Sequence, residues 1–507
     1  MLGVALSTHA VSPPVGASKD SVRAVLRSPS LLRREVIAGL VVALALIPEA
    51  ISFSILAGVD PRLGLFASFT MAVSIAFLGG RPAMISAATG AVALVVAPVA
   101  LNYGVDYLVA TVILAGVFQV ILGVAGAARL MRFIPRSVMV GFVNALAILI
   151  FEAQIHHMVH VPWMVYLFIA VGLGIIVATP KITKIVPGPL VAIVVLTGAA
   201  LVGGFDLPNV SDQGDLPNSL PARFFPNVPL TFETFQIIAP YALAMALVGL
   251  LESLLTAKLV DDITDTHSNK TREAWGQGAA NVITGFFGGM GGCAMIGQTM
   301  INVKASGART RVSTFMAGVL LLVLVVGLGD IVGQIPMAAL VAVMIIVSVG
   351  TFDWHSLRMI RTMPKSETTV MVTTVVVVVA THNLAIGVAV GVLVAMVLFA
   401  RRVAHLVNVE RELIERPDGS TYAHYTVTGE LFFASSNDLY SQFEYADDPD
   451  EILVDLTHSH IWDASTVAAL DGVTNKYAHK GKQVEIIGLN DPSAHIHGRL
   501  TGQLASH

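Results

Sequence analysis

Charge is scarce in this sequence. Only 13% of its 507 residues are Asp, Glu, Lys or Arg, 55% are hydrophobic, and the mean hydropathy is +0.76. Soluble globular proteins carry roughly 25% charged residues, and a soluble core this apolar would lack the polar surface to cover it. The composition therefore argues against a soluble protein, and the net charge of −4 indicates no nucleic-acid partner.

Cysteine and the common catalytic motifs are also nearly or wholly missing. The single cysteine, Cys293, excludes an intramolecular disulfide and a cysteine-based metal site. The sequence has no phosphate-binding loop, nucleophile elbow or HExxH motif. We therefore expect no enzyme, no ATP-driven transport, no metal site and no cofactor. His156, His157 and His160 lie at the end of an apolar segment, and we interpret them as interfacial side chains rather than ligands.

Apolar segments take the place of charge, and we place fourteen of them. Several are too short to cross a ~30 Å hydrocarbon layer as one straight helix. They lie near residues 35–56, 60–78, 83–101, 108–128, 137–155, 163–179, 188–203, 235–260, 275–289, 293–306, 312–329, 335–351, 367–381 and 384–400. This pattern predicts a polytopic α-helical membrane protein that resides in the lipid bilayer.

The basic residues predict the orientation of these spans. With the N-terminus inside, nearly every Lys and Arg before residue 403 falls in a cytoplasmic segment, and only Arg62 and Arg223 fall outside. Such a bias follows the positive-inside rule, and an even number of spans places both termini in the cytoplasm. We interpret residues 1–30 as a flexible cytoplasmic tail and residues 31–403 as the transmembrane transport domain.

The chain changes character after the last apolar segment. Residues 404–507 contain charge and histidine and have ordinary hydrophobicity. Tyr422–Phe433 alternates like a strand, Glu451–Thr457 and Gln483–Gly488 resemble short buried strands, and Thr466–His479 has helical periodicity. Strand, helix and strand in this order predict a small α/β domain.

Two pairs of similar segments indicate an internal repeat. Ala43–Ala50 (ALALIPEA) resembles Ala246–Ser253 (ALVGLLES), and Gly80–Ser86 (GRPAMIS) resembles Gly291–Gly297 (GGCAMIG). Each copy, near residues 31–205 and 233–403, holds seven segments, so the second copy is inverted in the membrane. Inverted repeats with broken helices are typical of secondary transporters. The alternative is chance similarity between apolar helices.

The second pair of segments carries the predicted anion site. Each resembles a short extended stretch that leads into a short helix, and irregular backbone at membrane depth is tolerated only inside protein or beside a cavity. Facing helix N-termini present free N–H groups and positive dipole ends to an anion. The termini lie at Ser86, Ala87, Ala88 and Thr89 in the first half and at Gly297, Gln298 and Thr299 in the second. Alternatively, these small residues only allow close helix packing.

Two carboxyl groups occupy equivalent positions of the repeat. Glu49 and Glu252 each lie late in an apolar span. Ionisable groups inside a membrane are costly and are functional candidates, and burial disfavours the ionised form of a carboxyl group. We therefore propose proton coupling through these residues, with Glu252 the preferred proton carrier. The alternative role is a structural hydrogen bond to a neighbouring helix.

These residues resemble a known family. Pro48–Thr70 (PEAISFSILAGVDPRLGLFASFT) and Asn281–Arg311 (NVITGFFGGMGGCAMIGQTMINVKASGARTR) are similar to the conserved regions of the sulfate-permease (SulP) family, which includes bacterial relatives of prestin and pendrin. The C-terminal region resembles a STAS domain. The resemblance implies seven plus seven spans in a core and a gate domain, a substrate site between the third and tenth spans, a homodimer in a bacterial-type inner (plasma) membrane, and a cytoplasmic partner for the STAS domain. Small anions are its substrates.

One departure from the family pattern bears on mechanism. Many members have Ser-Arg-[Ser/Thr] where this chain has Gly297-Gln298-Thr299, so a fixed positive charge is absent. We therefore expect proton-coupled symport of a dicarboxylate such as fumarate, with Phe53 and Ala294 adding contacts to the site. An exchanger of sulfate, bicarbonate or chloride is the second interpretation, and a membrane-anchored STAS sensor is the third.

Overall fold

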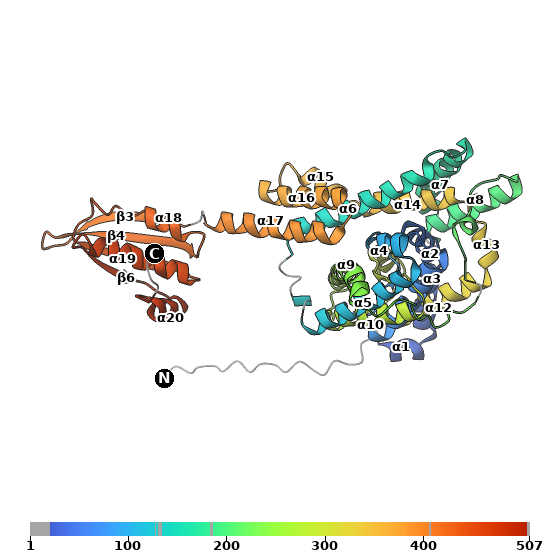
Figure 1. Cartoon of the computed structure of the whole chain (residues 1–507), viewed down its shortest axis with the longest axis horizontal. Helices are drawn as coiled ribbons and strands as arrows, with labels where there is room; N and C mark the ends of the chain where they lie inside the picture. Colours follow the sequence, from blue (N-terminus) through green and yellow to red (C-terminus); the bar gives the residue numbers. More distant parts are fainter. Residues whose placement is uncertain are drawn as a thin grey trace, which may run out of the picture. The chain divides into compact units, whose positions relative to one another are not determined.

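A computed structural model describes residues 21–126, 128–129, 134–182, 186–217, 219–404 and 407–503 (Figure 1). The chain divides into two compact units, one up to Gly391 and one from Val392. Of the tail expected over residues 1–30, the first twenty lie outside the described residues. In the remainder, Val22–Arg27 forms helix α1, which the Ser21 hydroxyl caps by accepting the Ala24 N–H at 3.1 Å, and the tail itself stays a prediction.

Long apolar helices build the first unit. Within the described residues, eight helices are long and apolar enough to cross a membrane. They are α2 (Pro29–Leu56), α3 (Pro61–Leu78), α5 (Val105–Val124), α6 (Arg136–Ile155), α7 (Trp163–Ile182), α9 (Phe232–Thr264), α14 (Met337–Thr351) and α17 (Leu384–Ala404). Shorter helices are α4 (Gly90–Tyr103), α8 (Gly188–Gly203), α10 (Lys270–Phe286), α11 (Ile296–Met300), α12 (Arg311–Gly327), α13 (Gly329–Gly333), α15 (Trp354–Met359) and α16 (Lys365–Thr381). Each expected apolar segment coincides with a helix or a broken helix; the count of fourteen spans stays a prediction.

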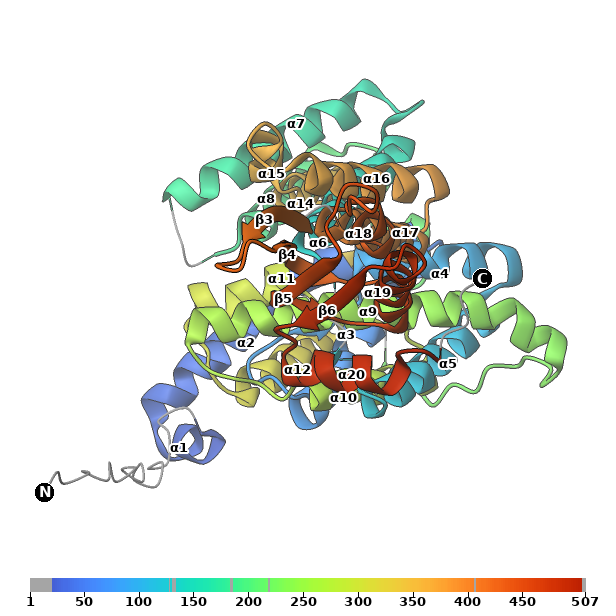
Figure 2. The ribbon, with the colours of Figure 1, turned by 90° about the vertical axis from the view of Figure 1, so that its left-hand side faces the viewer.

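The helices pack in two groups, which we call the core bundle and the gate bundle. In the core bundle, α5 packs along α9 and α10, and α12 packs against α2 and α3, with α4 and α11 between them. In the gate bundle, α6 packs against α14 and α16, and α7 packs against α8 and α14. The two groups occupy different sides of the unit in Figures 1 and 2. This arrangement leaves an interface between them where a site can form.

Two short strands cross at the centre of the core bundle. Strand β1 (Ser86–Ala87) precedes α4, strand β2 (Cys293–Ala294) precedes α11, and they pair antiparallel with Ser86 opposite Ala294. The sequence predicted this extended stretch before a helix in each half. The strands approach closely because residue 292 is glycine, since a Cβ there would lie 2.0 Å from the Ala87 carbonyl oxygen.

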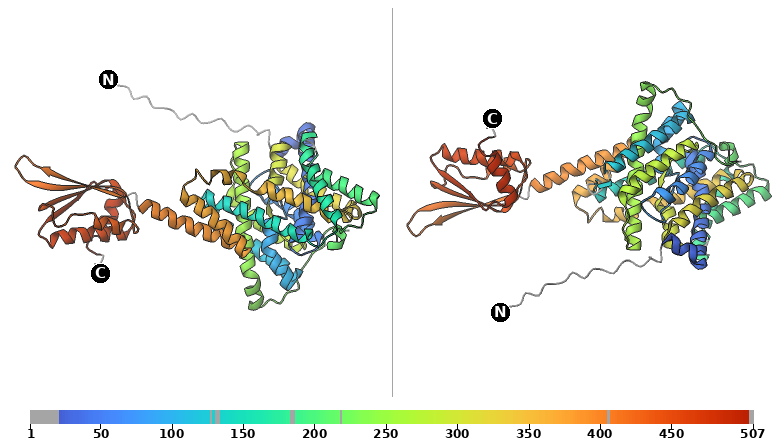
Figure 3. Two further views of the ribbon diagram at one scale, coloured as in Figure 1. Left: turned by 90° about the horizontal axis from the view of Figure 1, so that it is seen from above. Right: turned by 90° about the horizontal axis from the view of Figure 1, so that it is seen from below.

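The second unit is a four-stranded sheet in the order β3-β4-β5-β6. Strand β3 (Asn408–Glu415) is antiparallel to β4 (Thr421–Leu431), and β5 (Glu451–Ile461) and β6 (Gln483–Ile487) follow in parallel. The helices are α18 (Ser436–Ser441), α19 (Ala464–Ala478) and α20 (Asp491–Leu500), with α19 and α20 beside the sheet in Figure 3. The three expected strands and one helix are present, while β3, α18 and α20 were not predicted.

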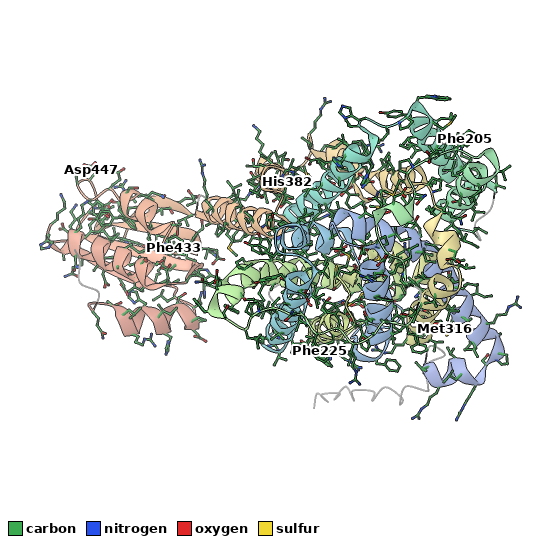
Figure 4. The ribbon with its side chains drawn as sticks, turned by 45° about the vertical axis from the view of Figure 1, so that its right-hand side comes forward. Phe205, Phe225, Met316, His382, Phe433 and Asp447 are labelled. Atoms are coloured by element: carbon green, nitrogen blue, oxygen red, sulfur yellow. The ribbon has the colours of Figure 1, made fainter. Side chains whose placement is uncertain are left out.

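The core of the second unit gathers around tyrosines. Tyr425 and Tyr477 are fully buried, together with leucine, valine and isoleucine side chains of β4, β5 and α19. Outside this core, Phe433 is 64% exposed (Figure 4). Ser465 is exposed in the first turn of α19, where the Asp463 carboxylate caps the helix by accepting the Thr466 N–H at 3.1 Å.

Candidate functional site

A cavity of about 400 Å³ lies between the core bundle and the gate bundle. Known small-molecule pockets span roughly 300–1,000 Å³, so a small ligand fits. The core bundle contributes Glu49, Phe53, Thr89, Gly90, Glu252, Leu255, Met295, Ile296 and Gly297, and the gate bundle contributes Phe142, Val143, Leu146, Ile150, Val347, Gly350 and Thr351. The polar groups therefore come mainly from the core bundle, and the gate wall is almost entirely apolar.

Among the described residues, the charged groups of the cavity wall are carboxyl groups. They belong to Glu49 and Glu252, and none of the described residues that line the cavity is Lys, Arg or His. An anion here meets helix N-termini and neutral donors, but also two groups that repel it when ionised. Protonation of one or both carboxyl groups removes that repulsion.

Helix α4 begins at the cavity. Thr89 caps it by accepting the Val92 N–H at 3.3 Å, and both Thr89 and Gly90 line the cavity. The first N–H groups of a helix have no partner within it. The Ala88 N–H, one residue earlier, donates to the Ser68 hydroxyl at 3.2 Å, which fixes the backbone that leads into the helix.

The second broken helix is short and irregular. Helix α11 has five residues and continues as the π-helix Ile301–Ala305, a geometry found frequently at functional sites. The Gln298 side chain of α11 contacts the first half of the repeat, where Gln298 Nε2 donates to Glu49 Oε1 at 2.8 Å. The Gln298 Oε1 has no hydrogen-bond partner among the described residues.

Glu252 is held through the buried thiol of Cys293. Cys293 Sγ donates to Glu252 Oε2 at 2.9 Å and lies 3.1 Å from Thr89 Oγ1. The adjacent Ala294 N–H donates to Ser253 Oγ at 3.1 Å, which ties β2 to α9. The carboxyl group of one half is thereby connected to the helix cap of the other half.

The predicted site residues divide into two sets. Phe53, Thr89 and Gly297 line the cavity together with Glu49 and Glu252. The others lie behind its wall and are buried: Ser86, Ala87, Ala88, Ala294, Gln298 and Thr299.

The hydroxyl groups of the second set bond to protein instead of facing the cavity. Ser86 Oγ accepts from Gln277 Nε2 at 2.6 Å, and Thr299 Oγ1 accepts the Ile85 N–H at 3.0 Å. Ala294 belongs to a small apolar cluster with Met84 and Ala257. These residues hold the two breaks in register.

Sequence reasoning missed several residues of the site. Cys293 was given no role beyond excluding a disulfide and a cysteine-based metal site, although it lies inside the second repeated segment. The lining residues on α6 and α14 could not be predicted, because nothing in the sequence distinguishes apolar side chains that face a cavity from apolar side chains that face lipid or protein. Two further buried carboxylates lie away from the cavity, and backbone N–H groups of Arg309 and of Gly80 donate to Glu35 and Glu273, respectively. No group of three or more His, Cys, Asp or Glu in the described part of the chain could hold a metal ion.

Comparison with known proteins identifies the family. The model of the sulfate permease family matches residues 32–166 and 160–374, and the STAS domain model matches residues 414–502. This chain belongs to the sulfate permease family. It is 51% identical to "Putative sulfate transporter YbaR" of Bacillus subtilis, over 91% of this chain and 95% of that protein. It is 24% identical to the bicarbonate transporter BicA of Picosynechococcus, over 90% and 88%.

Solved structures share the fold. The murine Solute Carrier 26 family member A9 anion transporter in the inward-facing state matches with a TM-score of 0.79 at 16% identity, over 92% of this chain and 87% of that one. The transmembrane domain of BicA matches with a TM-score of 0.60 at 24% identity, over 73% and 98%. The sulfate permease family member described here is therefore a multi-pass membrane anion transporter with a C-terminal STAS domain, and not an enzyme.

Proposed function

We propose that this family member is a proton-coupled symporter of a small carboxylate, with a dicarboxylate such as fumarate as the leading substrate. The observation that carries the proposal is the cavity wall, where Glu49 and Glu252 stand without a Lys, Arg or His among the described lining residues. A dianion cannot be held beside two ionised carboxylates in a low-dielectric site, so protons accompany it. Glu252 takes the coupling proton.

Alternating access follows from the two bundles. The core bundle supplies the carboxyl groups, the Thr89 cap and the α4 terminus, and the gate bundle supplies an apolar wall. When the core bundle moves against the gate bundle, the substrate bound to the core passes the apolar wall of the gate bundle. The proposal includes a homodimer and a cytoplasmic partner of the STAS domain, which the family resemblance implies, and cytoplasmic termini, which the distribution of basic residues predicts.

An exchanger of sulfate, bicarbonate or chloride is the second candidate. It is favoured by the names of the relatives, which include sulfate and bicarbonate transporters. An exchanger needs a counter-anion inside the vesicle, whereas a symporter needs a proton gradient.

The test is uptake of radiolabelled fumarate and sulfate into proteoliposomes, with and without an inward proton gradient. Fumarate uptake that the gradient stimulates supports symport. Uptake that ignores the gradient but requires an internal anion overturns it in favour of exchange.

The Glu252→Gln variant tests the proton carrier. Gln keeps the size of the side chain but cannot bind and release a proton near neutral pH. We therefore expect the proton gradient to stimulate uptake less than about twofold. Glu233→Gln, on the same helix but outside this cavity, serves as the control. Full stimulation in Glu252→Gln would show that Glu252 does not carry the proton.

A further inference from the structure

Three side chains form a hydrogen-bonded chain behind the cavity wall. Glu252 Oε2 is 2.9 Å from Cys293 Sγ, and Cys293 Sγ is 3.1 Å from Thr89 Oγ1. Glu252 and Thr89 both line the cavity, while Cys293 is fully buried. Two cavity-lining groups from different halves of the repeat are thus joined by a buried thiol that is not among the described residues lining the cavity.

The protons of this chain can be counted. A thiol has one hydrogen, and an ionised carboxylate only accepts. When Glu252 is ionised, the thiol hydrogen therefore goes to its Oε2. The contact between Cys293 and Thr89 then requires the Thr89 hydroxyl to donate to Sγ. The single Thr89 hydroxyl hydrogen is then used by Sγ and cannot bind a ligand, while Thr89 Oγ1 also accepts the Val92 N–H.

We propose that protonation of Glu252 reverses this chain and turns the Thr89 hydroxyl hydrogen into the cavity, where it donates to the anion. The added proton sits on Glu252 Oε2 and is donated to Cys293 Sγ. The thiol hydrogen rotates to Thr89 Oγ1, which releases the Thr89 hydroxyl hydrogen. The incoming proton forms one new O–H bond on Glu252, the thiol and hydroxyl hydrogens only change direction, and no covalent bond breaks.

Cys293 is then a positioning residue that links proton binding to anion binding. This role rests on the proposed function, since it explains how a proton on Glu252 favours the anion beyond the removal of one negative charge. It also explains why α4 begins with a hydroxyl-bearing cap at the cavity, where Asp or Asn would cap as well but could not release a hydroxyl donor.

Few other titratable groups surround Glu252. Glu49 lies in the wall of the same cavity, on α2, and bonds to Gln298. Helix α11 carries no charged residue. The other titratable groups on the elements packed against α9 are Tyr103 on α4, Asp106 and Tyr107 on α5, and Lys270, Arg272 and Glu273 on α10. None of these lines the cavity, and Asp106 and Glu273 accept backbone N–H groups elsewhere, at Asn227 and Gly80.

The experiment measures fumarate affinity of the full chain in detergent from pH 5.5 to 8.5, with sulfate as the probe if fumarate does not bind. One proton bound with each anion tightens binding by up to about tenfold for each unit of pH lowered. We compare wild type with Cys293→Ser, which keeps a donor and an acceptor, and with Cys293→Ala, which has neither. Cys293→Val replaces Cys293→Ala if the latter does not fold.

We expect Cys293→Ser to keep the wild-type pH slope and Cys293→Ala to lose at least half of it. In Cys293→Ala the Thr89 hydroxyl is free in both states of Glu252, so affinity above pH 7.5 should be tighter than in wild type. Thr89→Val should weaken affinity at pH 5.5 about tenfold, and adding Cys293→Ala to it should change the pH slope no further.

The outcomes separate the two proposals. A pH-dependent wild type with an unchanged slope in Cys293→Ala overturns the role of Cys293 alone. An effect of Cys293→Ala that persists in the Thr89→Val background also overturns it. Wild-type affinity that does not depend on pH overturns the proposed symport.

Discussion

Gln298 occupies the place where many family members carry arginine, and its amide donates to Glu49 at 2.8 Å. A neutral amide leaves the protonation of Glu49 free to change. A guanidinium in its place would pair with the carboxylate and keep it ionised.

We therefore expect Gln298→Arg to weaken proton dependence. The fixed positive charge should tighten sulfate binding at pH 8 by about tenfold, equivalent to roughly 1.4 kcal/mol, because the anion no longer needs a proton. Sulfate and fumarate affinities at pH 6 and pH 8 measure this change. Gln298→Met, of similar length but without charge, is the control; a Gln298→Arg protein with the wild-type pH slope contradicts the explanation.

In the STAS domain, the buried carboxylate of Asp448 accepts hydrogen bonds from three side chains. Arg411 Nε and Tyr425 Oη donate to it at 2.7 Å each, and Tyr477 Oη donates as well. Burial raises the pKa of both tyrosines, and their hydrogen bonds to Asp448 raise it further. Both hydroxyls therefore stay protonated and keep donating at neutral pH.

Asp448→Ala should destabilise the STAS domain by about 3 kcal/mol, because it leaves two buried tyrosine hydroxyls without their acceptor and removes the ion pair with Arg411. Faster hydrogen exchange over residues 407–503 of the full chain would report this loss. Asp447, the exposed neighbour (Figure 4), provides the matched control, and Asp447→Ala should exchange like wild type. Equal exchange in both variants would rule out a central role for Asp448.

At the scale of elements, the pairing of β1 with β2 joins the two halves of the site. The strands pair through Ser86 opposite Ala294 and Ala87 opposite Cys293. Thr299 from the second half bonds to the Ile85 N–H in the first half at 3.0 Å. Each broken helix is thus positioned by the other, and a change in one displaces both.

Gly292→Ala should separate these strands. Its Cβ would lie 2.0 Å from the Ala87 carbonyl oxygen, so we expect uptake to fall by at least tenfold. Gly198→Ala on α8 is the control, because nothing lies within 4 Å of a Cβ there. Proteoliposome uptake, at matched protein content, compares them. Normal uptake by Gly292→Ala would show that the strand spacing is not critical.

The sequence predicted the secondary-structure elements better than it predicted which side chains contact the cavity. The third and tenth segments were recognised because Gly80–Ser86 and Gly291–Gly297 resemble each other, and the structure has an extended stretch and a helix in each. Strand β3 (NVERELIE) was missed because its residues are mostly exposed and polar, so it lacks the alternation of a half-buried strand. Which of Ser86 and Thr89 faces the cavity depends on local backbone rotation, which residue type does not specify.

At the scale of the whole molecule, the two compact units suggest a division of labour. The cavity and both candidate proton carriers belong to the unit before Gly391, whereas the STAS domain has its own sheet and apolar core. A transporter with this organisation binds its substrate in the first unit, while a membrane-anchored sensor depends on the second.

A chain that ends at residue 407 should therefore bind fumarate within about twofold of the full chain. Equilibrium binding in detergent, with matched thermal stability, makes the comparison. The full chain carrying Asp447→Ala controls for changes confined to the STAS surface. Loss of binding on truncation, in protein that remains folded, would favour the sensor interpretation.

The carboxyl-lined cavity also has an electrical consequence. Glu49 and Glu252 are neutral once each holds a proton, and no Lys, Arg or His stands among the described residues around them. Moving one net charge against the membrane potential costs about 2.3 kcal/mol per 100 mV. Under the proposed symport, a dianion that travels with the single coupling proton on Glu252 moves one net negative charge, whereas a second proton on Glu49 would make the movement electroneutral. The dependence of uptake on membrane potential would therefore report whether one glutamate or both carry a proton during transport.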